Sequence, residues 1–333
     1  MALVSDPITI RGNKIKNRIV MVPMVTFSFH GDDGAYYGMQ HVEHYAQHAQ
    51  GGAGMIIVQA TNVSGAATST NQWSADNRRF LTQIAKSCHR QGVTAMIQLA
   101  CGNLDINILS ISEIQLIQKD MKQACICAGE MGFDGAEFHF AHGFTLCKML
   151  DAAENRRTDQ FGGKIENRTR ILTEILPEIR AQVPPNFLVG VRMGEYQPNC
   201  SDGTAAALAF EQAGIDLLHI SFGMHEPGQA APEDFICSRM AYSGHRIRRS
   251  VHIPVIAVGE LRTEEQVRYL VEKDYADFAG IGRGMLADPQ FANHVMNSKP
   301  INACHGCRRC LWFTDHFKCP ARRASSAAAN LTR

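Results

Sequence analysis

Short apolar runs alternate with segments of helical character along most of the chain. The runs are rich in Val, Ile and Phe, and most of them lack a strict alternation of apolar and polar residues. This pattern is typical of strands that are buried on both faces, as in a parallel sheet covered by helices. Helices are predicted between the runs, for example over Ser112–Glu130 and Thr263–Lys273. The predicted strands are Ile19–Val22, Met55–Gln59, Thr94–Gln98, Gly135–His139, Phe187–Met193, Leu217–Ser221, Pro254–Val258 and Phe278–Gly282.

Eight units of strand and helix indicate one closed α/β architecture. Parallel strands need right-handed crossovers, and eight is the number of strands that closes a (β/α)8 TIM barrel. Ahead of the first unit, Ile8–Lys16 is predicted to form a hairpin that turns at Gly12-Asn13, and we expect it to plug the bottom of the barrel. We therefore expect a barrel over residues 1–298, a cysteine-rich segment over 299–322 and a poorly ordered tail over 323–333.

The fold predicts where the chemistry takes place, because TIM barrels carry their active sites at the carboxyl ends of the strands. Polar residues and glycines gather at that end of the predicted units. The loops after the seventh and eighth strands are the usual phosphate site of this fold, where glycine lets the backbone approach and arginine supplies a charged partner. The residues at these ends include Pro23, Met24, Gln59, Ala60, Gln98, His139, Arg192, His225, Gly259, Gly282 and Arg283.

The overall composition narrows the range of partners. The 333 residues are 45% hydrophobic and 20% charged, with a net charge of +1, so no bulk attraction to nucleic acid or to an anionic membrane is expected. No apolar run approaches the roughly 20 residues of a membrane helix, and the N-terminus shows no secretory signal. We expect a cytoplasmic protein whose eleven cysteines are reduced. The sequence leaves a homo-oligomer open.

Four of the cysteines are clustered near the end of the chain. Cys304, Cys307, Cys310 and Cys319 form the pattern C-x2-C-x2-C-x8-C. Four thiolates suit the four corners of a [4Fe–4S] cluster, and they equally satisfy a tetrahedral zinc ion. The spacing alone does not separate these two metal sites. The other cysteines are scattered and are expected to be small buried hydrophobes.

The motif NRRTDQFGGKIENR over Asn155–Arg168 is the most specific stretch of the chain. It occurs together with VMVPM ending at Met24, IQLA ending at Ala100, HFAHG beginning at His139 and GIGR ending at Arg283. With these motifs the chain resembles the Old Yellow Enzyme family over essentially residues 5–320. It is more closely similar to the iron–sulfur branch, which includes 2,4-dienoyl-CoA reductase and trimethylamine dehydrogenase. The resemblance implies noncovalent FMN, and it favours an iron–sulfur cluster over zinc at the four cysteines.

The resemblance also implies roles for residues at the strand ends. Gln98 should bond the pyrimidine edge of the flavin, and Arg192 should lie near its N1 and O2 atoms, where a positive charge stabilises the reduced anion. No cysteine occurs in Val25-Thr26-Phe27, where the trimethylamine dehydrogenases attach FMN, so no covalent bond is expected. The residues implied to line the isoalloxazine are Pro23, Met24, Val25 and Ala60, and those implied to hold the phosphate are Gly259, Gly282 and Arg283.

Two histidines and a missing tyrosine define the expected chemistry. His139 and His142 match a pair that, in the enzymes this chain resembles, binds the carbonyl oxygen of an activated alkene. The family usually places a proton-donating tyrosine two residues after the second histidine, and here this position is Phe144. His225, which together with Glu226 matches a His-Glu pair of the dienoyl-CoA reductases, is our candidate for the proton donor.

Three further histidines, His41, His44 and His48, have the spacing of one helix face. No carboxylate or cysteine joins them in the sequence, so a solvated or interface face is favoured over a metal site.

We therefore expect an FMN-dependent reductase of a conjugated C=C bond, with electrons relayed through a [4Fe–4S] cluster. The electrons would come from NAD(P)H over the flavin or from a separate redox protein, because no G-x-G-x-x-G motif follows a predicted strand. Two other functions stay open. One is a dehydrogenase of amines or other saturated substrates that exports electrons through the cluster, and the other is a non-catalytic electron-transfer subunit.

Overall fold

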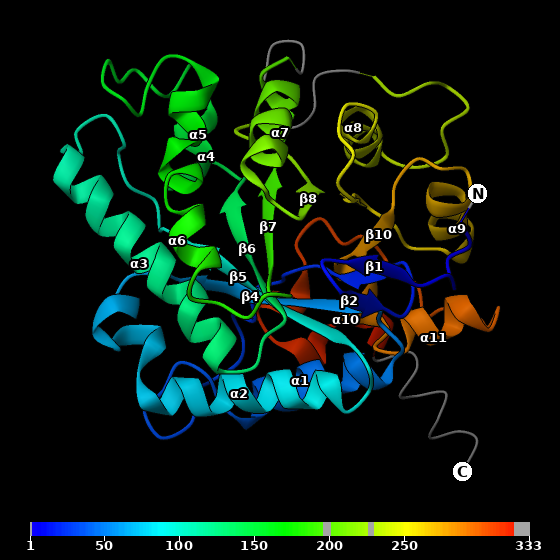
Figure 1. The fold of residues 1–333 in the computed structure, drawn as a ribbon. Helices are drawn as coiled ribbons and strands as arrows, with labels where there is room; N and C mark the ends of the chain where they lie inside the picture. Colours follow the sequence, from blue (N-terminus) through cyan, green and yellow to red (C-terminus); the bar gives the residue numbers. More distant parts are fainter. Residues whose placement is uncertain (1, 196–200, 226–229, 323–333) are drawn as a thin grey trace.

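The computed structural model describes residues 2–195, 201–225 and 230–322. Its centre is a closed barrel of parallel strands in the order β10-β3-β4-β5-β6-β7-β8-β9, and helices surround the barrel (Figure 1). Every predicted strand is found, with ends that differ by a few residues, so the (β/α)8 prediction is confirmed. The strands are β3 (Ile19–Met21), β4 (Met55–Asn62), β5 (Thr94–Ala100), β6 (Gly135–Phe140), β7 (Leu188–Met193), β8 (Leu217–Ile220), β9 (Val255–Val258) and β10 (Phe278–Ile281).

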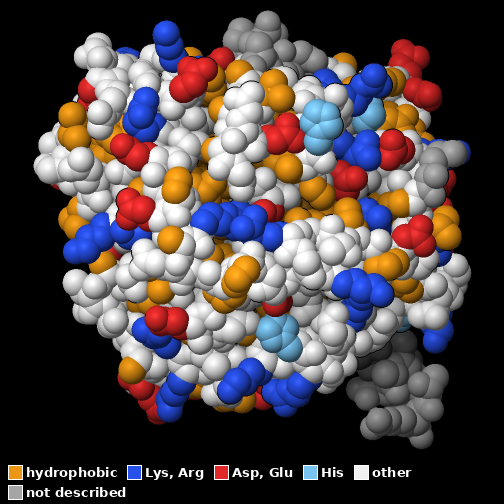
Figure 2. Space-filling view, viewed as in Figure 1, with side chains coloured by type: hydrophobic (Ala, Val, Ile, Leu, Met, Phe, Trp, Pro, Cys, Tyr) orange, Lys and Arg blue, Asp and Glu red, His pale blue; other side chains and the backbone are white. Residues whose placement is uncertain are grey.

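The N-terminal hairpin closes the bottom of the barrel. β1 (Ile8–Ile10) pairs antiparallel with β2 (Asn13–Ile15), and the hairpin lies across the barrel at the front of Figure 1. Ile10 and Ile15 are buried in one cluster with side chains from the starts of the barrel strands, such as Met55. The predicted plug is therefore confirmed. Figure 2 shows the same face of the molecule. Acidic, basic and hydrophobic side chains are intermingled on it.

Four helices, α2, α3, α8 and α9, begin at a serine or threonine whose side chain caps the first turn. In α3, Ser110 Oγ accepts from the backbone N–H of Glu113 at 3.2 Å, and the Glu113 carboxylate accepts from the backbone N–H of Ser110 at 2.7 Å. The helices predicted over Ser112–Glu130 and Thr263–Lys273 are both found, as α3 and α9. The helices are α1 (Met39–Gln50), α2 (Ala75–His89), α3 (Ile111–Glu130), α4 (Thr145–Leu150), α5 (Ile165–Thr173), α6 (Leu176–Arg180), α7 (Ser201–Ala213), α8 (Arg239–Arg248), α9 (Glu264–Glu272), α10 (Arg283–Ala287) and α11 (Phe291–Met296), with the 3-10 turns η1 (Ala66–Thr68), η2 (Asn71–Trp73), η3 (Leu311–Phe313) and η4 (His316–Lys318).

The cysteine-rich segment packs against the barrel through α1. Trp312, in η3, is fully buried, and its ring centroid lies 5.5 Å from those of Phe29 and His44. His41, His44 and His48 are all buried on this side of α1. The expectation of a solvated helix face is therefore wrong, and the expectation of an interface is correct. Phe29 packs against His41 and His44, and Trp312 also covers His44. His48 Nε2 instead lies 3.0 Å from the Met285 carbonyl in α10.

The NRRTDQFGGKIENR motif has a structural role near the rim of the barrel. Asn155 donates through its amide to two backbone carbonyls, at 2.8 and 2.9 Å. Arg157 pairs with Asp159 and also donates to two carbonyls of the loop before α3. Arg168 is buried and pairs with Asp202 at 2.9 Å. These contacts fix the chain between α4 and α5 rather than line the cavity described below.

Some sequence expectations fall outside the described residues. The tail predicted over 323–333, as well as Cys200 and Glu226, lies there. Across the described ranges, none of the helices is both long enough and apolar enough to cross a membrane.

Candidate active site at the carboxyl ends of the strands

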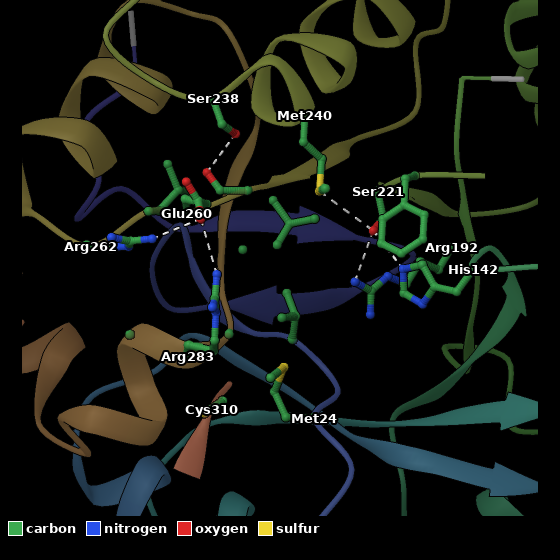
Figure 3. A pocket seen from close by; sticks show the side chains of 18 of the residues that line it. Met24, His142, Arg192, Ser221, Ser238, Met240, Glu260, Arg262, Arg283 and Cys310 are labelled. Atoms are coloured by element: carbon green, nitrogen blue, oxygen red, sulfur yellow. Dashed lines mark hydrogen bonds and ion pairs between the residues drawn. The ribbon is translucent and has the colours of Figure 1, made fainter. Parts of the chain in front are cut away.

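A cavity of about 710 Å³ opens where the carboxyl ends of the barrel strands meet the cysteine-rich segment. Figure 3 shows polar side chains gathered at two ends of this cavity, one around Arg192 and the other around Arg283. The cavity lies at the end of the barrel where the sequence places the site. The lining residues are Val22, Met24, His142, Arg192, Ser221, Phe222, Ser238, Arg239, Met240, Val258, Gly259, Glu260, Leu261, Arg262, Gly280, Gly282, Arg283, Gly284, Arg308, Cys310 and Phe313.

At one end of the cavity, four side chains form a hydrogen-bonded chain. Arg192 in β7 donates to Ser221 Oγ at 3.2 Å, and Ser221 Oγ lies 2.8 Å from Nε2 of His142 (Figure 3). His142 Nδ1 in turn lies 2.9 Å from Nε2 of His139 in β6. The two imidazoles are therefore bonded to each other. One of these bonds must open before both rings can reach a single substrate oxygen.

Burial keeps these imidazoles neutral. Burial and the nearby charge of Arg192 lower the pKa of His139 to about 3, and the same causes lower the pKa of His142 even more strongly. Burial lowers the pKa of Arg192 to about 10, which leaves the guanidinium charged at neutral pH. Arg192 Nε and His139 Nδ1 are buried, and within the described part of the chain no partner reaches them. Buried polar atoms without partners are costly, and Arg192 lines the cavity, so a polar ligand atom at this end would offer its guanidinium a partner.

Behind this end, a buried carboxylate lies in the barrel interior. Glu137 accepts from Gln98 Nε2 at 2.7 Å and from His219 Nδ1 at 2.9 Å, and all three side chains are almost completely buried. Burial by itself would raise the pKa of Glu137, but His219 and Arg192 outweigh it and lower that pKa below its usual value. Burial and Arg192 lower the pKa of His219. A neutral imidazole therefore donates to an ionised Glu137, whose charge balances that of Arg192.

Sequence reasoning does not identify Glu137, His219 or Ser221 as site residues. A signal for them is nevertheless present in the predicted strands. Glu137 precedes His139 by two residues and His219 precedes Ser221 by two, so each pair points to the same side of its strand. Glu137 and His219 could have been identified as ionisable residues within otherwise apolar strands.

The other end of the cavity combines a glycine with two arginines. Gly259 has a φ of 144°, and a Cβ at this position would lie 2.4 Å from Ser238 Oγ, so a side chain does not fit. Ser238 Oγ donates to the Gly259 carbonyl at 2.9 Å. Arg283 and Arg262 both donate to Glu260 Oε1, at 3.2 and 2.9 Å (Figure 3). Open backbone beside two guanidinium groups suits an anionic group of a ligand.

Several residues that the sequence singles out do not line the cavity. Pro23 and Gln98 are buried, Val25 and Ala60 are half-buried, and His225 is exposed. None of these five is among the lining residues, whereas Pro23 and Val25 flank one that is. His139 is not among the lining residues either, so both His139 and His225 lie outside the space that His142 borders.

The four clustered cysteines line a second, small cavity together. Cys319 is buried, and the other three are half-buried. Cys310 and Arg283 line both this cavity and the larger one, so the two spaces adjoin at these side chains. Throughout the described ranges, no three His, Cys, Asp or Glu side chains are grouped in the arrangement of a metal-ion site.

Comparison with curated proteins relates the chain to known oxidoreductases. The model of the NADH:flavin oxidoreductase / NADH oxidase family matches residues 4–108 and 101–302. NADPH dehydrogenase of Halalkalibacterium halodurans is 31% identical, with coverage of 84% of this chain and 90% of that protein. NADH oxidase of Thermoanaerobacter brockii is 29% identical, with coverage of 88% of this chain and 51% of that protein. The chain thus spans about half the length of the NADH oxidase.

Solved structures share the fold. 2-Naphthoyl-CoA reductase in complex with 2-naphthoyl-CoA superposes with a TM-score of 0.80 at 19% identity, covering 94% of this chain and 55% of that one. Histamine dehydrogenase from Rhizobium sp. 4-9 gives 0.79 at 21%, covering 93% and 50%. At these identities the structures show the fold alone. Because the family model covers well over half of the sequence, the chain belongs to the NADH:flavin oxidoreductase / NADH oxidase family and is an oxidoreductase.

Proposed function

We propose that this protein is an FMN-dependent oxidoreductase that reduces a conjugated C=C bond, with electrons relayed through a [4Fe–4S] cluster. The cavity itself carries the proposal, because one end combines Arg192 with His142 and the other combines Gly259 with Arg283. A flavin ring at the first end and the phosphate of the same FMN at the second end would give the charged and polar groups at both ends a partner. The family match and the relatives named NADPH dehydrogenase and NADH oxidase support FMN and NAD(P)H as cofactors.

The phosphate of FMN is proposed to lie at the end formed by Gly259, Gly282 and Arg283. Gly259 lines the cavity and has no room for a side chain beside Ser238. Arg283 lines the same space and can form two parallel hydrogen bonds to phosphate oxygens. These features support a phosphate site at this end of the cavity.

The flavin ring is proposed to lie at the Arg192 end. FMN, when bound, supplies the hydride chemistry of the reaction. The chain supplies the charge of Arg192 for the N1–O2 edge of the ring, and the unpartnered Nε atom of Arg192 supports this placement within the described residues. Gln98 donates its amide N–H to Glu137, which leaves the Gln98 carbonyl to accept from the pyrimidine edge. The residues proposed to contact the ring faces are Pro23, Met24, Val25 and Ala60.

His139 and His142 are proposed to bind the electron-withdrawing oxygen of the substrate. Their lowered pKa values keep both rings neutral at pH 7, so they act as hydrogen-bond donors rather than as acids. If the 2.9 Å bond between them opens when substrate arrives, one N–H becomes free for the substrate oxygen. A donor at that oxygen draws electron density from the β-carbon and makes it a better hydride acceptor.

His225 is proposed to deliver the proton to the other carbon of the double bond. The backbone N–H of His142 donates to the carbonyl of Phe222 at 3.3 Å, so the loop that leads to His225 lies against the turn that carries His142. Phe144, whose ring lies 5.3 Å from that of His139, has no proton to give. An exposed imidazole can exchange protons with solvent, which suits this role.

The segment over residues 299–322 is proposed to hold the cluster through Cys304, Cys307, Cys310 and Cys319. All four cysteines line one cavity, and a cubane takes one thiolate at each of four separate irons. Four thiolates would also suit a tetrahedral zinc ion, and the resemblance to the iron–sulfur branch is what favours the cluster. Because Cys310 also lines the larger cavity, the proposed cluster would adjoin the proposed flavin.

A single preparation tests the proposal. The protein is purified without oxygen, assayed for FMN, iron and sulfide, and titrated with NADPH, NADH and then dithionite while its spectrum is recorded. We expect FMN together with about four irons per chain, and reoxidation of the reduced flavin by an α,β-unsaturated carbonyl compound. One zinc with negligible iron would contradict the cluster. Flavin bleaching by a saturated substrate without added reductant would instead favour a dehydrogenase.

A further inference from the structure

Glu260 lies at a junction beside the proposed phosphate site. Its Oε1 atom accepts from Arg283 at 3.2 Å and from Arg262 at 2.9 Å, so one carboxylate is shared by two guanidinium groups (Figure 3). Its backbone has a φ of 54°, in the left-handed region that residues other than glycine seldom adopt. This conformation directs the Glu260 side chain to a position between the two arginines.

Arg262 connects this ion-pair group to the cysteine-rich segment. A Cβ added to Gly306 would lie 2.4 Å from Nη1 of Arg262 and 2.8 Å from its Cζ, so the guanidinium packs directly on the Gly306 backbone. Gly306 has a φ of 65° and stands between Cys304 and Cys307, and its N–H lies 3.5 Å from Cys304 Sγ. A displacement of Arg262 therefore acts on a loop that carries two of the four cysteines.

We propose that Glu260 and Arg262 link occupancy of the phosphate site to the stability of the loop around Gly306. This inference rests on the proposed FMN and cluster sites. A phosphate dianion that reaches Arg283 competes with Glu260 for that guanidinium, because phosphate offers more charge and more acceptor oxygens. Glu260 then pairs with Arg262 alone and holds it against Gly306.

The link acts in both directions. If phosphate binding stabilises the loop around Gly306, then assembly of a cluster at that loop strengthens phosphate binding by the same factor. The Glu260 side chain is 58% exposed, and those of Arg262 and Arg283 are 31% and 34% exposed. Solvent screens such pairs, so we expect the coupling between the phosphate site and the loop to be a factor of about five, at the low end for coupled sites. This coupling should be lost at roughly 1 M salt.

The test measures how fast iron is lost to a ferrous chelator from the anaerobic protein after removal of its flavin. The protein is assayed alone, with saturating FMN and with saturating riboflavin. Riboflavin fills the ring end of the cavity but has no phosphate, so the ratio of the two release rates isolates the phosphate. In the wild type, FMN should slow release about fivefold more than riboflavin does.

Substitutions assign this ratio to the two residues. Glu260→Gln and Arg262→Lys should bring it close to one, since a neutral amide cannot hold Arg262 and an ammonium cannot span both Glu260 and Gly306. Glu264→Gln is the matched control, because it breaks a similar pair with Arg268, at 2.7 Å in α9, away from the cavity. It should keep the wild-type ratio.

The outcomes separate the link from the proposed function. A wild-type ratio in both Glu260→Gln and Arg262→Lys, with melting temperatures unchanged, would overturn the link while leaving FMN and the cluster in place. If Glu260→Gln does not fold, Arg262→Lys decides alone. A wild-type preparation that contains no iron and sulfide, or that retains no FMN, would overturn the proposed function and with it the link.

Discussion

The histidines of α1 and those at the end of β6 have similar spacing and similar electrostatics. His41 and His44 are buried on α1, and burial lowers the pKa of His41 to about 4 and that of His44 further. His139 is buried and His142 half-buried, and burial lowers the pKa of both. Their surroundings differ. His44 lies among rings, 5.3 Å from Phe29, whereas the second group is bonded to Ser221 at the edge of a cavity.

This difference indicates which observation would mark a functional histidine. A lowered pKa follows from burial alone, and it appears in both groups. What separates them is the presence of open space: His142 lines the cavity together with Arg192, while His44 fills an interface with Trp312 and its neighbours. Perturbed titration is therefore informative only together with a cavity.

The largest effect expected from this comparison is on catalysis. His142→Ala removes a donor to the substrate oxygen, and it should slow reoxidation of the reduced enzyme by an activated alkene by about 10²–10³-fold. Reduction of the flavin by NAD(P)H should change little. Stopped-flow absorbance measures both half-reactions. His44→Ala, the same change in the other group, is the control and should keep the wild-type rate per bound flavin. Equal rates in His142→Ala and the wild type would contradict the role assigned to the pair.

The reverse effect is expected on stability. His44→Ala should lower the free energy of unfolding by about 2–4 kcal/mol, because it leaves a cavity between α1 and Trp312. His44→Phe keeps a ring and should recover most of the loss, since His44 Nε2 has no partner within the described residues. Urea unfolding measures these differences. If His142→Ala destabilises the protein as much as His44→Ala does, the two groups are not distinct in the way proposed here.

Acid should destabilise the protein through both groups alike. A histidine whose pKa is lowered in the folded state binds its proton more readily in the unfolded chain. Its contribution to stability is therefore complete above about pH 6.5 and declines as the pH falls toward the folded pKa. For His41 and His139 this window runs down to about pH 4 and about pH 3. Each should cost about 1.4 kcal/mol per pH unit within it.

Unfolding free energies measured at several pH values between 7.5 and 4.5 check this expectation. Replacing either histidine by phenylalanine should reduce the slope of stability against pH by the contribution of one proton. A slope that responds to substitution of His41 but not of His139 would show that the β6 group is hydrated in the folded protein.

The sequence predicts the barrel well because its signals are local. Apolar runs such as Thr94–Gln98 are buried on both faces in the structure and need no knowledge of distant residues. The plug formed by Ile10 and Ile15 follows from a short hairpin pattern. At the site, Gly259 and Arg283 could be placed because the fold fixes where strand ends meet.

What the sequence does not predict depends on closure of the barrel. The bond between Glu137 in β6 and His219 in β8 spans the barrel interior past β7, so neither residue signals the other along the chain. The covering of His44 by Trp312 likewise joins the two ends of the chain. Tertiary contacts of this kind decide whether a helix face is solvated, and the spacing of histidines along a helix does not predict such contacts.

The smallest effect expected concerns the proton donor. Phe144 precedes α4 and its ring lies 5.3 Å from that of His139, so Phe144→Tyr places a hydroxyl beside the histidine pair and should raise the rate of reoxidation by simple enones about fivefold, or roughly 1 kcal/mol. His225→Ala should lower the wild-type rate by about tenfold. This is less than the 10²–10⁴-fold typical of a positioned acid, because His225 is exposed and water can replace it in part. In the double variant, loss of His225 should change the rate of reoxidation very little, since the new tyrosine can supply the proton. Stopped-flow reoxidation of the four proteins checks this. A wild-type rate in His225→Ala would mean that the proton comes directly from solvent, and the role proposed for His225 would be wrong.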